Sequence, residues 1–147
     1  MALLHLICGL PCSGKSTLAK RLEQELPALR LTPDEWMARL VGEGGDEKKR
    51  EIVEAIQWEI ALHAVKLGIN VILENGFWSR SEREDLRARA AAFGVKVKLH
   101  FLNVPLEELH RRLVARNASL PPNTFRVTEE ELNLWWTWFE PPTSEEL

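Results

Sequence analysis

A short stretch near the N-terminus has the residue types and spacing that hold phosphate groups. Residues 9–16, GLPCSGKS, match G-x-x-x-x-G-K-[ST] at every fixed position. Glycines in this pattern let backbone N–H groups turn toward phosphate oxygens, and the N-terminus of the following helix attracts the anion. We expect Lys15 to reach the β- and γ-phosphates and the Ser16 hydroxyl to bind Mg²⁺. The predicted nucleotide-binding residues are Gly9, Pro11, Cys12, Ser13, Gly14, Lys15, Ser16 and Thr17.

An acidic residue, Asp34, follows the predicted second strand. Ligands of open α/β sheets bind at the carboxyl ends of the strands. We therefore expect Asp34 to contact the substrate and, as a general base, to accept the proton of an acceptor hydroxyl. The alternative is an ordinary helix start, in which Thr32 and Glu35 form a capping box and Asp34 only favours the first turn.

A second acidic residue, Glu74, closes another apolar run. At the same edge of the sheet its carboxylate would face the phosphates, where it could hold Mg²⁺ through a water molecule or bind the substrate. The alternative is a plain turn at Asn75-Gly76 with an acidic neighbour.

Arginines on a later predicted helix could neutralise phosphate charge. Arg112 and Arg116 are four residues apart, so they share one helix face. An arginine in this place can stabilise the phosphoryl group during transfer, although a cation also favours a helix C-terminus in its own right. The loop that follows, NASLPPNTFR, has the composition of a mobile lid. We expect a lid around residues 112–127, with Arg126 as a third candidate.

Arg80 is a further candidate on the substrate side, because it lies close to the end of the Glu74 strand. Arg83 and Arg87 share its helix face. Acidic residues are interleaved with these arginines, a pattern that predicts a solvent-exposed face of salt bridges.

Hydrophobic periodicity predicts the scaffold that positions these residues. Apolar runs predict strands at 3–8, 29–31, 69–75 and 95–104. Helical spacing predicts helices over 16–26, from Pro33, and over 51–67, 79–93, 105–116 and 128–139. Residues 41–50 are predicted as a charged loop and 140–147 as a tail. The alternation predicts one α/β domain over residues 1–147, with a parallel sheet covered on both faces.

Composition limits the partners and the compartment. The chain has 147 residues and a net charge of −3, which disfavours long nucleic acid as a partner without excluding it. The two cysteines, Cys8 and Cys12, are too close to the start of the chain to staple a fold, and both lie in or beside the phosphate motif, which favours a reducing cytoplasm. No stretch is long and apolar enough to span a membrane. We expect a cytoplasmic monomer.

Aromatic residues gather in the last predicted helix. They could form a stacking platform for bases, but core packing is the favoured interpretation, with one ring near the nucleotide. These residues are Trp135, Trp136, Trp138 and Phe139. The four histidines of the chain show no metal-ligand spacing.

With these motifs in hand, the chain resembles the small P-loop kinases. That group includes polynucleotide 5′-hydroxyl kinases, zeta-toxin-like kinases, chloramphenicol phosphotransferase-like enzymes and AAA_33 proteins. The resemblance covers most of the chain, and it implies a P-loop NTPase fold, three-layer α/β/α, with a four- or five-stranded parallel sheet. The segments that carry it are GLPCSGKSTLAKRL, LTPDEW, NVILENGFWSRSEREDLR, LNVPLEELHRRLVARN and WFEPPTSEEL.

The resemblance also implies roles for individual residues. In the group, the aspartate after the second strand is the general base, which corresponds to Asp34, and an acidic residue ends the third strand, as Glu74 does. The arginine pair in RLVAR is similar to that of adenylate kinases, which implies that Arg112 packs near adenine and Arg116 touches phosphates. Polynucleotide kinases have D-x-x-R after the base, whereas Arg39 comes five residues after Asp34. A fifth strand has no room before Leu147.

These observations predict a kinase that uses ATP and Mg²⁺ and transfers the γ-phosphoryl group to a hydroxyl of a small-molecule acceptor. The alternatives are a polynucleotide 5′-hydroxyl kinase and an ATP-binding or ATP-hydrolysing regulator with no acceptor. The chain has no N-K-x-D motif, which argues against a GTPase switch.

Overall fold

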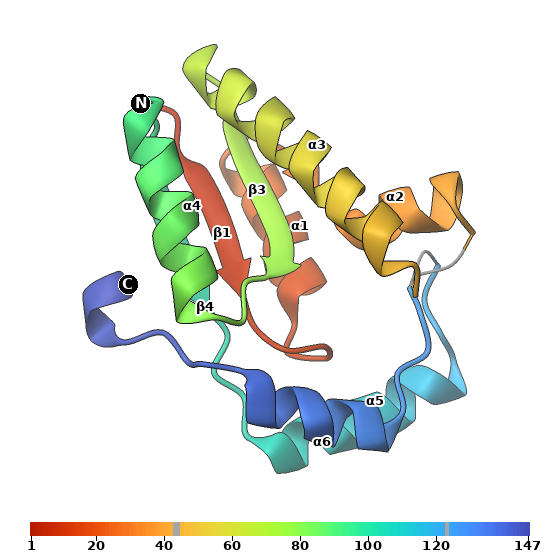
Figure 1. The fold of residues 1–147 in the computed structure, drawn as a ribbon. Helices are drawn as coiled ribbons and strands as arrows, with labels where there is room; N and C mark the ends of the chain where they lie inside the picture. The colour runs from red at the N-terminus through yellow and green to blue at the C-terminus, as the bar shows by residue number, and fades with distance from the viewer. Residues whose placement is uncertain (43–44, 123) are drawn as a thin grey trace.

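The four predicted strands form one parallel sheet in the computed structural model, which describes residues 1–42, 45–122 and 124–147. The predicted loop 41–50 and the predicted lid therefore lie partly outside the described residues. The strands are β1 (Leu4–Cys8), β2 (Ala28–Leu31), β3 (Asn70–Gly76) and β4 (Val97–Phe101), in the order β2-β3-β1-β4 (Figure 1). Since all four run the same way, their carboxyl ends meet at one edge of the sheet. The predicted α/β class with a four-stranded parallel sheet is confirmed.

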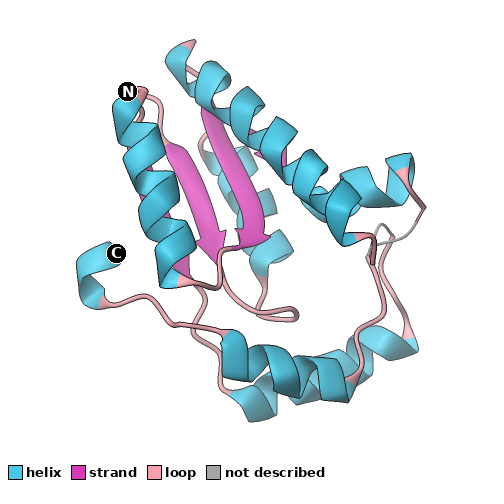
Figure 2. Cartoon of the chain, viewed as in Figure 1, coloured by secondary structure: helices cyan, strands magenta, loops and turns pink. Residues whose placement is uncertain are grey.

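Helices cover both faces of this sheet, as expected of a parallel sheet. In Figures 1 and 2, α3 and α4 lie over one face and α1 over the other, whereas α5 and α6 lie side by side beyond the carboxyl ends of the strands. The helices are α1 (Lys15–Glu25), α2 (Pro33–Leu40), α3 (Glu47–Lys66), α4 (Arg80–Ala92), α5 (Leu106–Ala118) and α6 (Glu129–Trp138). None of the described helices has the length and apolar character needed to cross a membrane.

One helix start and one helix cap differ from the sequence prediction. The α3 helix begins at Glu47 rather than at residue 51, because the Asp46 side chain accepts a hydrogen bond from Lys49 N and caps it. Thr32 precedes α2 but makes no side-chain capping bond. Its predicted partner Glu35 instead accepts a 2.8 Å hydrogen bond from Arg30, so the predicted capping box is wrong.

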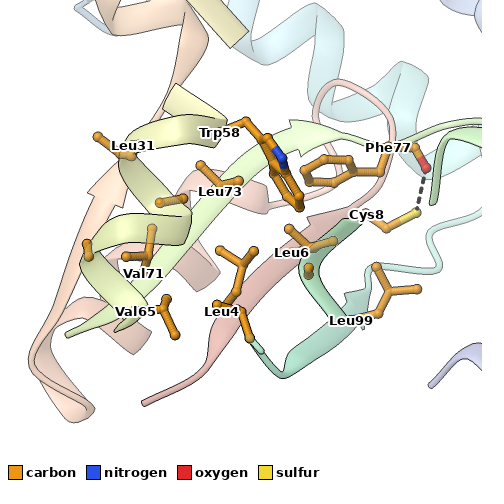
Figure 3. Packing of buried hydrophobic residues seen from close by; sticks show 14 residues of the cluster. Leu4, Leu6, Cys8, Leu31, Trp58, Val65, Val71, Leu73, Phe77 and Leu99 are labelled. Carbon is orange, nitrogen blue, oxygen red and sulfur yellow. Dashed lines mark hydrogen bonds between the residues drawn. The ribbon is translucent and has the colours of Figure 1, made fainter. Parts of the chain in front are cut away.

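The core forms on both sides of the sheet, because successive strand residues point to opposite faces. On one face Leu6 and Leu73 pack with Trp58 of α3, as Figure 3 shows. On the other face Ile7 and Ile72 pack against α1. A third buried cluster joins the residues after β1 to α5 and α6, and it consists of Leu10, Leu109, Leu113, Val127 and Leu132.

The C-terminal segment, residues 139–147, is bound to α4 instead of forming a free tail. It ends in a 3-10 helix (Ser144–Glu146). The Glu146 carboxylate accepts hydrogen bonds from Arg83 Nε at 2.9 Å and Arg87 Nη1 at 3.0 Å. Arg83 is fully buried and also donates to Phe77 O at 2.8 Å. The predicted solvent-exposed salt-bridge face is therefore wrong for Arg83, because its partner comes from a distant part of the chain.

Candidate functional site

The predicted phosphate-binding loop connects β1 to α1 at the carboxyl edge of the sheet. Gly14 precedes α1 with a φ of 99°, and Cys12 has a φ of 69°, so the loop uses the left-handed region twice. A Cβ at Gly9 would lie 2.5 Å from Ser13 Oγ, so the Ser13 side chain would have to rotate away. The backbone is thus shaped as a narrow turn, and α1 points its N-terminus at whatever the loop holds.

Lys15 is folded back over this loop. Its Nζ donates to Gly9 O at 3.2 Å and to Leu10 O at 3.3 Å. Burial lowers the pKa of Lys15, whereas the carboxylates of Asp34 and Glu74 act in the opposite direction. The ammonium group therefore lies in the field of both predicted acidic residues, although they belong to different elements.

Ser16 and Glu74 are brought into direct contact. Ser16 Oγ donates to Glu74 Oε1 at 3.0 Å, and Arg30 Nη1 lies 3.7 Å from Glu74 Oε2. Burial raises the pKa of Glu74, against the effects of Arg30 and Ser16. A hydroxyl and a carboxylate are hard oxygen ligands of the kind that Mg²⁺ prefers. These two side chains fit a magnesium ion shared with nucleotide phosphates.

Asp34 lies in the first turn of α2, at the same edge of the sheet. Its Oδ1 accepts a 2.6 Å hydrogen bond from Arg50 Nη2 of α3. Glu54, one turn further along α3, has a pKa raised to about 7, mainly by burial, with Arg50 acting against this and Asp34 adding to it. The region around Asp34 thus combines carboxylates with one paired arginine.

The two predicted lid arginines lie on α5, against the loop. Arg112 Nη1 donates to Cys12 O at 3.2 Å, and its Nε donates to Glu108 at 3.0 Å. Arg116 Nη1 lies 3.5 Å from Cys12 Sγ, while its Nη2 donates to Phe125 O at 2.9 Å. Together with Lys15, the two guanidinium groups surround the loop with positive charge.

Other predicted residues lie further from this centre. Arg80 donates to Glu84 of α4 at 2.8 Å and lies 3.9 Å from Glu145 of the C-terminal segment. Its ion pairs are therefore with these two elements and not with the loop. Arg126 is exposed. Within the loop region, Pro11 is half-buried at the turn and Thr17 is exposed in the first turn of α1.

Of the four aromatic residues at the end of the chain, Trp135 and Phe139 pack as predicted, whereas Trp136 and Trp138 are exposed, against the prediction of core packing. Trp135 lies against Trp78 with ring centroids 5.6 Å apart, and Phe139 stacks on Phe101 at 5.9 Å. A cavity of about 230 Å³ separates the loop from the end of β4 and the end of α6. Its lining includes Leu10, Ser13, Leu102, Asn103, Trp136 and Phe139.

Three residues of the site were missed by the sequence reasoning. Arg50 binds Asp34, Arg30 lies beside Glu74, and Trp78 Nε1 donates to Gly9 O at 3.1 Å. No motif marks the two arginines, because each reaches its partner from another element. For Trp78 a weak signal exists: a large side chain with a single N–H donor follows directly on a strand that ends at the site.

Comparisons with known proteins identify the family and the fold. The family model AAA_33, described as AAA domain, matches residues 4–142. No curated protein matches the chain in sequence.

Solved structures show the same fold at low sequence identity. A gluconokinase from Sinorhizobium meliloti 1021 has a TM-score of 0.68 and 18% identity, covering 97% of this chain and 78% of that chain. A chain of the Pnkp1/Rnl/Hen1 RNA repair complex has a TM-score of 0.78 and 19% identity, covering 93% of this chain and 43% of that chain. An APS kinase from Mycobacterium tuberculosis has a TM-score of 0.59 and 22% identity, covering 71% and 77%.

Proposed function

Because the chain belongs to the AAA_33 family and has the P-loop NTPase fold, we propose that it is a kinase dependent on ATP and Mg²⁺. It transfers the γ-phosphoryl group to a hydroxyl of a small-molecule acceptor. The observation that carries this proposal is the 3.0 Å hydrogen bond from Ser16 Oγ to Glu74 Oε1, next to Lys15. A phosphate-binding loop joined to a buried carboxylate can hold a metal–nucleotide complex.

In this proposal Ser16 and Glu74 hold the magnesium ion, with Glu74 acting directly or through water. When bound, Mg²⁺ neutralises charge on the β- and γ-phosphates. Lys15 binds the same phosphates, while the backbone N–H groups of Gly14 to Thr17, where the loop joins α1, point toward them.

Asp34 is proposed as the general base. Arg50 holds its Oδ1, which leaves Oδ2 to accept the proton of an acceptor hydroxyl. The acceptor then lies between α2, the start of α3 and Glu74. Arg80 is kept as a substrate-side candidate that would have to leave Glu84 to take part.

Arg112 and Arg116 are proposed to stabilise charge on the phosphoryl group during transfer. Both already contact Cys12, so each has only a short distance to move toward a bound nucleotide. We propose that residues 112–127 form the lid of a single kinase domain, with Arg112 near the adenine side. We further propose that the protein acts as a cytoplasmic monomer.

A polynucleotide 5′-hydroxyl kinase is the second candidate. It is favoured by the fold similarity to a chain of the RNA repair complex, with a TM-score of 0.78. The net charge of −3 and the residues Trp36 and Met37 in place of a nearby arginine argue against it. The third candidate is a regulator that binds or hydrolyses ATP.

Transfer of label from [γ-³²P]ATP separates these three functions. The assay compares a panel of small polyols, sugars and nucleosides with an oligonucleotide bearing a 5′-hydroxyl and with no acceptor. Label on a small molecule supports the proposal, label on the oligonucleotide supports the second candidate, and label only in inorganic phosphate supports the third.

Two variants test the assigned roles in the same assay. Asp34→Asn should lower transfer by about 10²- to 10⁴-fold, because the base is lost, while ATP binding stays near that of the wild type. Lys15→Met should weaken ATP binding itself. Unchanged transfer by Asp34→Asn would show that the base has been assigned to the wrong residue.

A further inference from the structure

We propose that Trp78 is a positioning residue for Lys15, an inference that rests on the proposed nucleotide binding by the loop. The indole Nε1 of Trp78 donates to Gly9 O at 3.1 Å. Lys15 Nζ donates to the same oxygen at 3.2 Å. A carbonyl oxygen has two lone pairs, so both bonds form together. The indole thus fixes, from the outside of the loop, the peptide group that holds the lysine ammonium.

Gly76, the last residue of β3, gives the indole the space to reach this carbonyl. A Cβ at Gly76 would lie 2.8 Å from Trp78 Nε1 and 3.1 Å from Gly9 O. Its φ of 96° also turns the chain sharply after Asn75. In addition, Gly9 N donates to Gly76 O at 3.0 Å. Both the N–H and the carbonyl of Gly9 are therefore hydrogen-bonded to the segment that ends β3.

The other side of Trp78 is held by the last part of the chain. Glu140 N donates to Trp78 O at 2.9 Å, and the Trp135 ring packs on the indole. A continuous series of contacts therefore runs from the C-terminal segment through Trp78 to Gly9 and Lys15.

The consequence concerns the direction in which Lys15 points. Its ammonium has three N–H donors, and the carbonyls of Gly9 and Leu10 take two of them, which leaves one for a phosphate oxygen. If the Gly9 peptide rotates, the remaining donor turns away from the phosphates. Small errors in the placement of such a group are costly in rate and affinity.

Trp78→Phe tests the inference, because it keeps a ring and removes the N–H donor. Binding of ATP with Mg²⁺ is measured by titration calorimetry, and thermal unfolding of the nucleotide-free protein shows whether the variant folds. We expect ATP affinity to fall roughly fivefold to tenfold. Trp138→Phe is the matched control, since Trp138 is exposed on α6 and makes no hydrogen bond to the loop among the described residues. It should bind ATP within about twofold of the wild type.

A double-variant cycle distinguishes positioning of Lys15 from a general structural effect. In a Lys15→Met background, Trp78→Phe should change the remaining nucleotide affinity by less than about twofold, because the group that it positions is gone. An equal loss in both backgrounds would overturn the inference. So would wild-type affinity in Trp78→Phe.

A second measurement does not depend on the folding of Trp78→Phe. The indole N–H resonance of Trp78, assigned through bonds by NMR, should shift in Lys15→Met, since the shared acceptor loses one donor. No shift would contradict the shared carbonyl. A wild-type protein that binds no nucleotide at all would overturn the proposed function and this inference together, whereas normal wild-type binding with an unaffected Trp78→Phe overturns the inference alone.

Discussion

Glu74 is a buried carboxylate whose polar neighbours include the hydroxyls of Ser16 and Thr32 and the guanidinium group of Arg30. Ser16 Oγ holds one carboxylate oxygen, and Arg30 lies 3.7 Å from the other. Such a group is costly to bury unless it gains a partner, and a bound cation supplies one. A metal–nucleotide complex, as proposed above, would supply such a cation to this pair.

Glu74→Gln tests this role. The amide keeps the size of the side chain but removes its charge, so we expect the Mg²⁺ concentration for half-maximal activity to rise about 10- to 100-fold. Activity is measured against Mg²⁺ at constant ATP. Glu84→Gln is the control, since Glu84 pairs with Arg80 on the exposed side of α4. An unchanged Mg²⁺ dependence would remove Glu74 from the metal site.

The role of Arg116 can be tested by comparing it with Arg111, another arginine of the same helix. It contacts Cys12 and Phe125, whereas Arg111 on the same helix pairs with Glu108 and is exposed. Arg116→Ala should lower kcat by about 10³-fold if its guanidinium stabilises the transferring phosphoryl group. Arg111→Ala should leave kcat near that of the wild type. Single-turnover measurements at saturating ATP make this comparison independent of ATP affinity.

At the level of elements, α4 is held in place by a buried ion pair. Arg83 is fully buried and Glu146 has a side-chain exposure of 2%. Hydrogen bonding from Arg83 is the largest cause that lowers the pKa of Glu146 to about 2. A lowered carboxyl pKa stabilises the fold above the unfolded-state value, and this contribution is lost as the pH falls toward 2.

Glu146→Gln should accordingly lower the free energy of unfolding at pH 7 by about 3 kcal/mol, because a buried guanidinium loses its counter-charge. The deficit should shrink as the pH falls from 5 to 2, because the Glu146 carboxyl of the unfolded wild type takes up a proton in this range, whereas that of the folded protein does so only near pH 2. Chemical denaturation over this range measures both effects. Glu145→Gln, next to it and 84% exposed, should differ little from the wild type. A deficit that does not depend on pH would argue against an ionic contribution.

The same elements show what the sequence can predict. The strands, the loop and the Asp34 and Glu74 positions follow from local patterns, since parallel strands bring their carboxyl ends together whatever the connections are. The capping box at Thr32 was predicted wrongly because Arg30 competes for Glu35. The burial of Arg83 could not be predicted, because its partner Glu146 becomes a neighbour only after folding.

Across the whole molecule, charge is divided between the two sides of the loop. Lys15, Arg112 and Arg116 surround the loop itself, whereas Asp34 and Glu54 lie on the side of α2 and α3. The cationic side suits the polyphosphate. On the other side, Arg50 of α3 is paired with Asp34 of α2.

Because its pKa is raised, Glu54 makes the free energy of unfolding depend on pH. Its pKa is raised to about 7, chiefly by burial, so the folded state binds a proton that the unfolded state has released. The resulting contribution to stability is fully present below the unfolded-state pKa, near 4.5, and is lost as the pH rises through 7.

Glu54→Gln should therefore raise the free energy of unfolding at pH 8 by roughly 1 to 3 kcal/mol and have little effect at pH 4.5. Urea denaturation at both pH values measures the difference, and Glu59→Gln, exposed on the same helix, is the matched control. Such a result would mean that the ionised Glu54 carboxylate destabilises the folded, nucleotide-free protein at pH 8. If Glu54→Gln instead destabilises the protein at pH 8, the ionised form must be stabilised by Arg50, and the acidic side carries a net ion pair rather than excess negative charge.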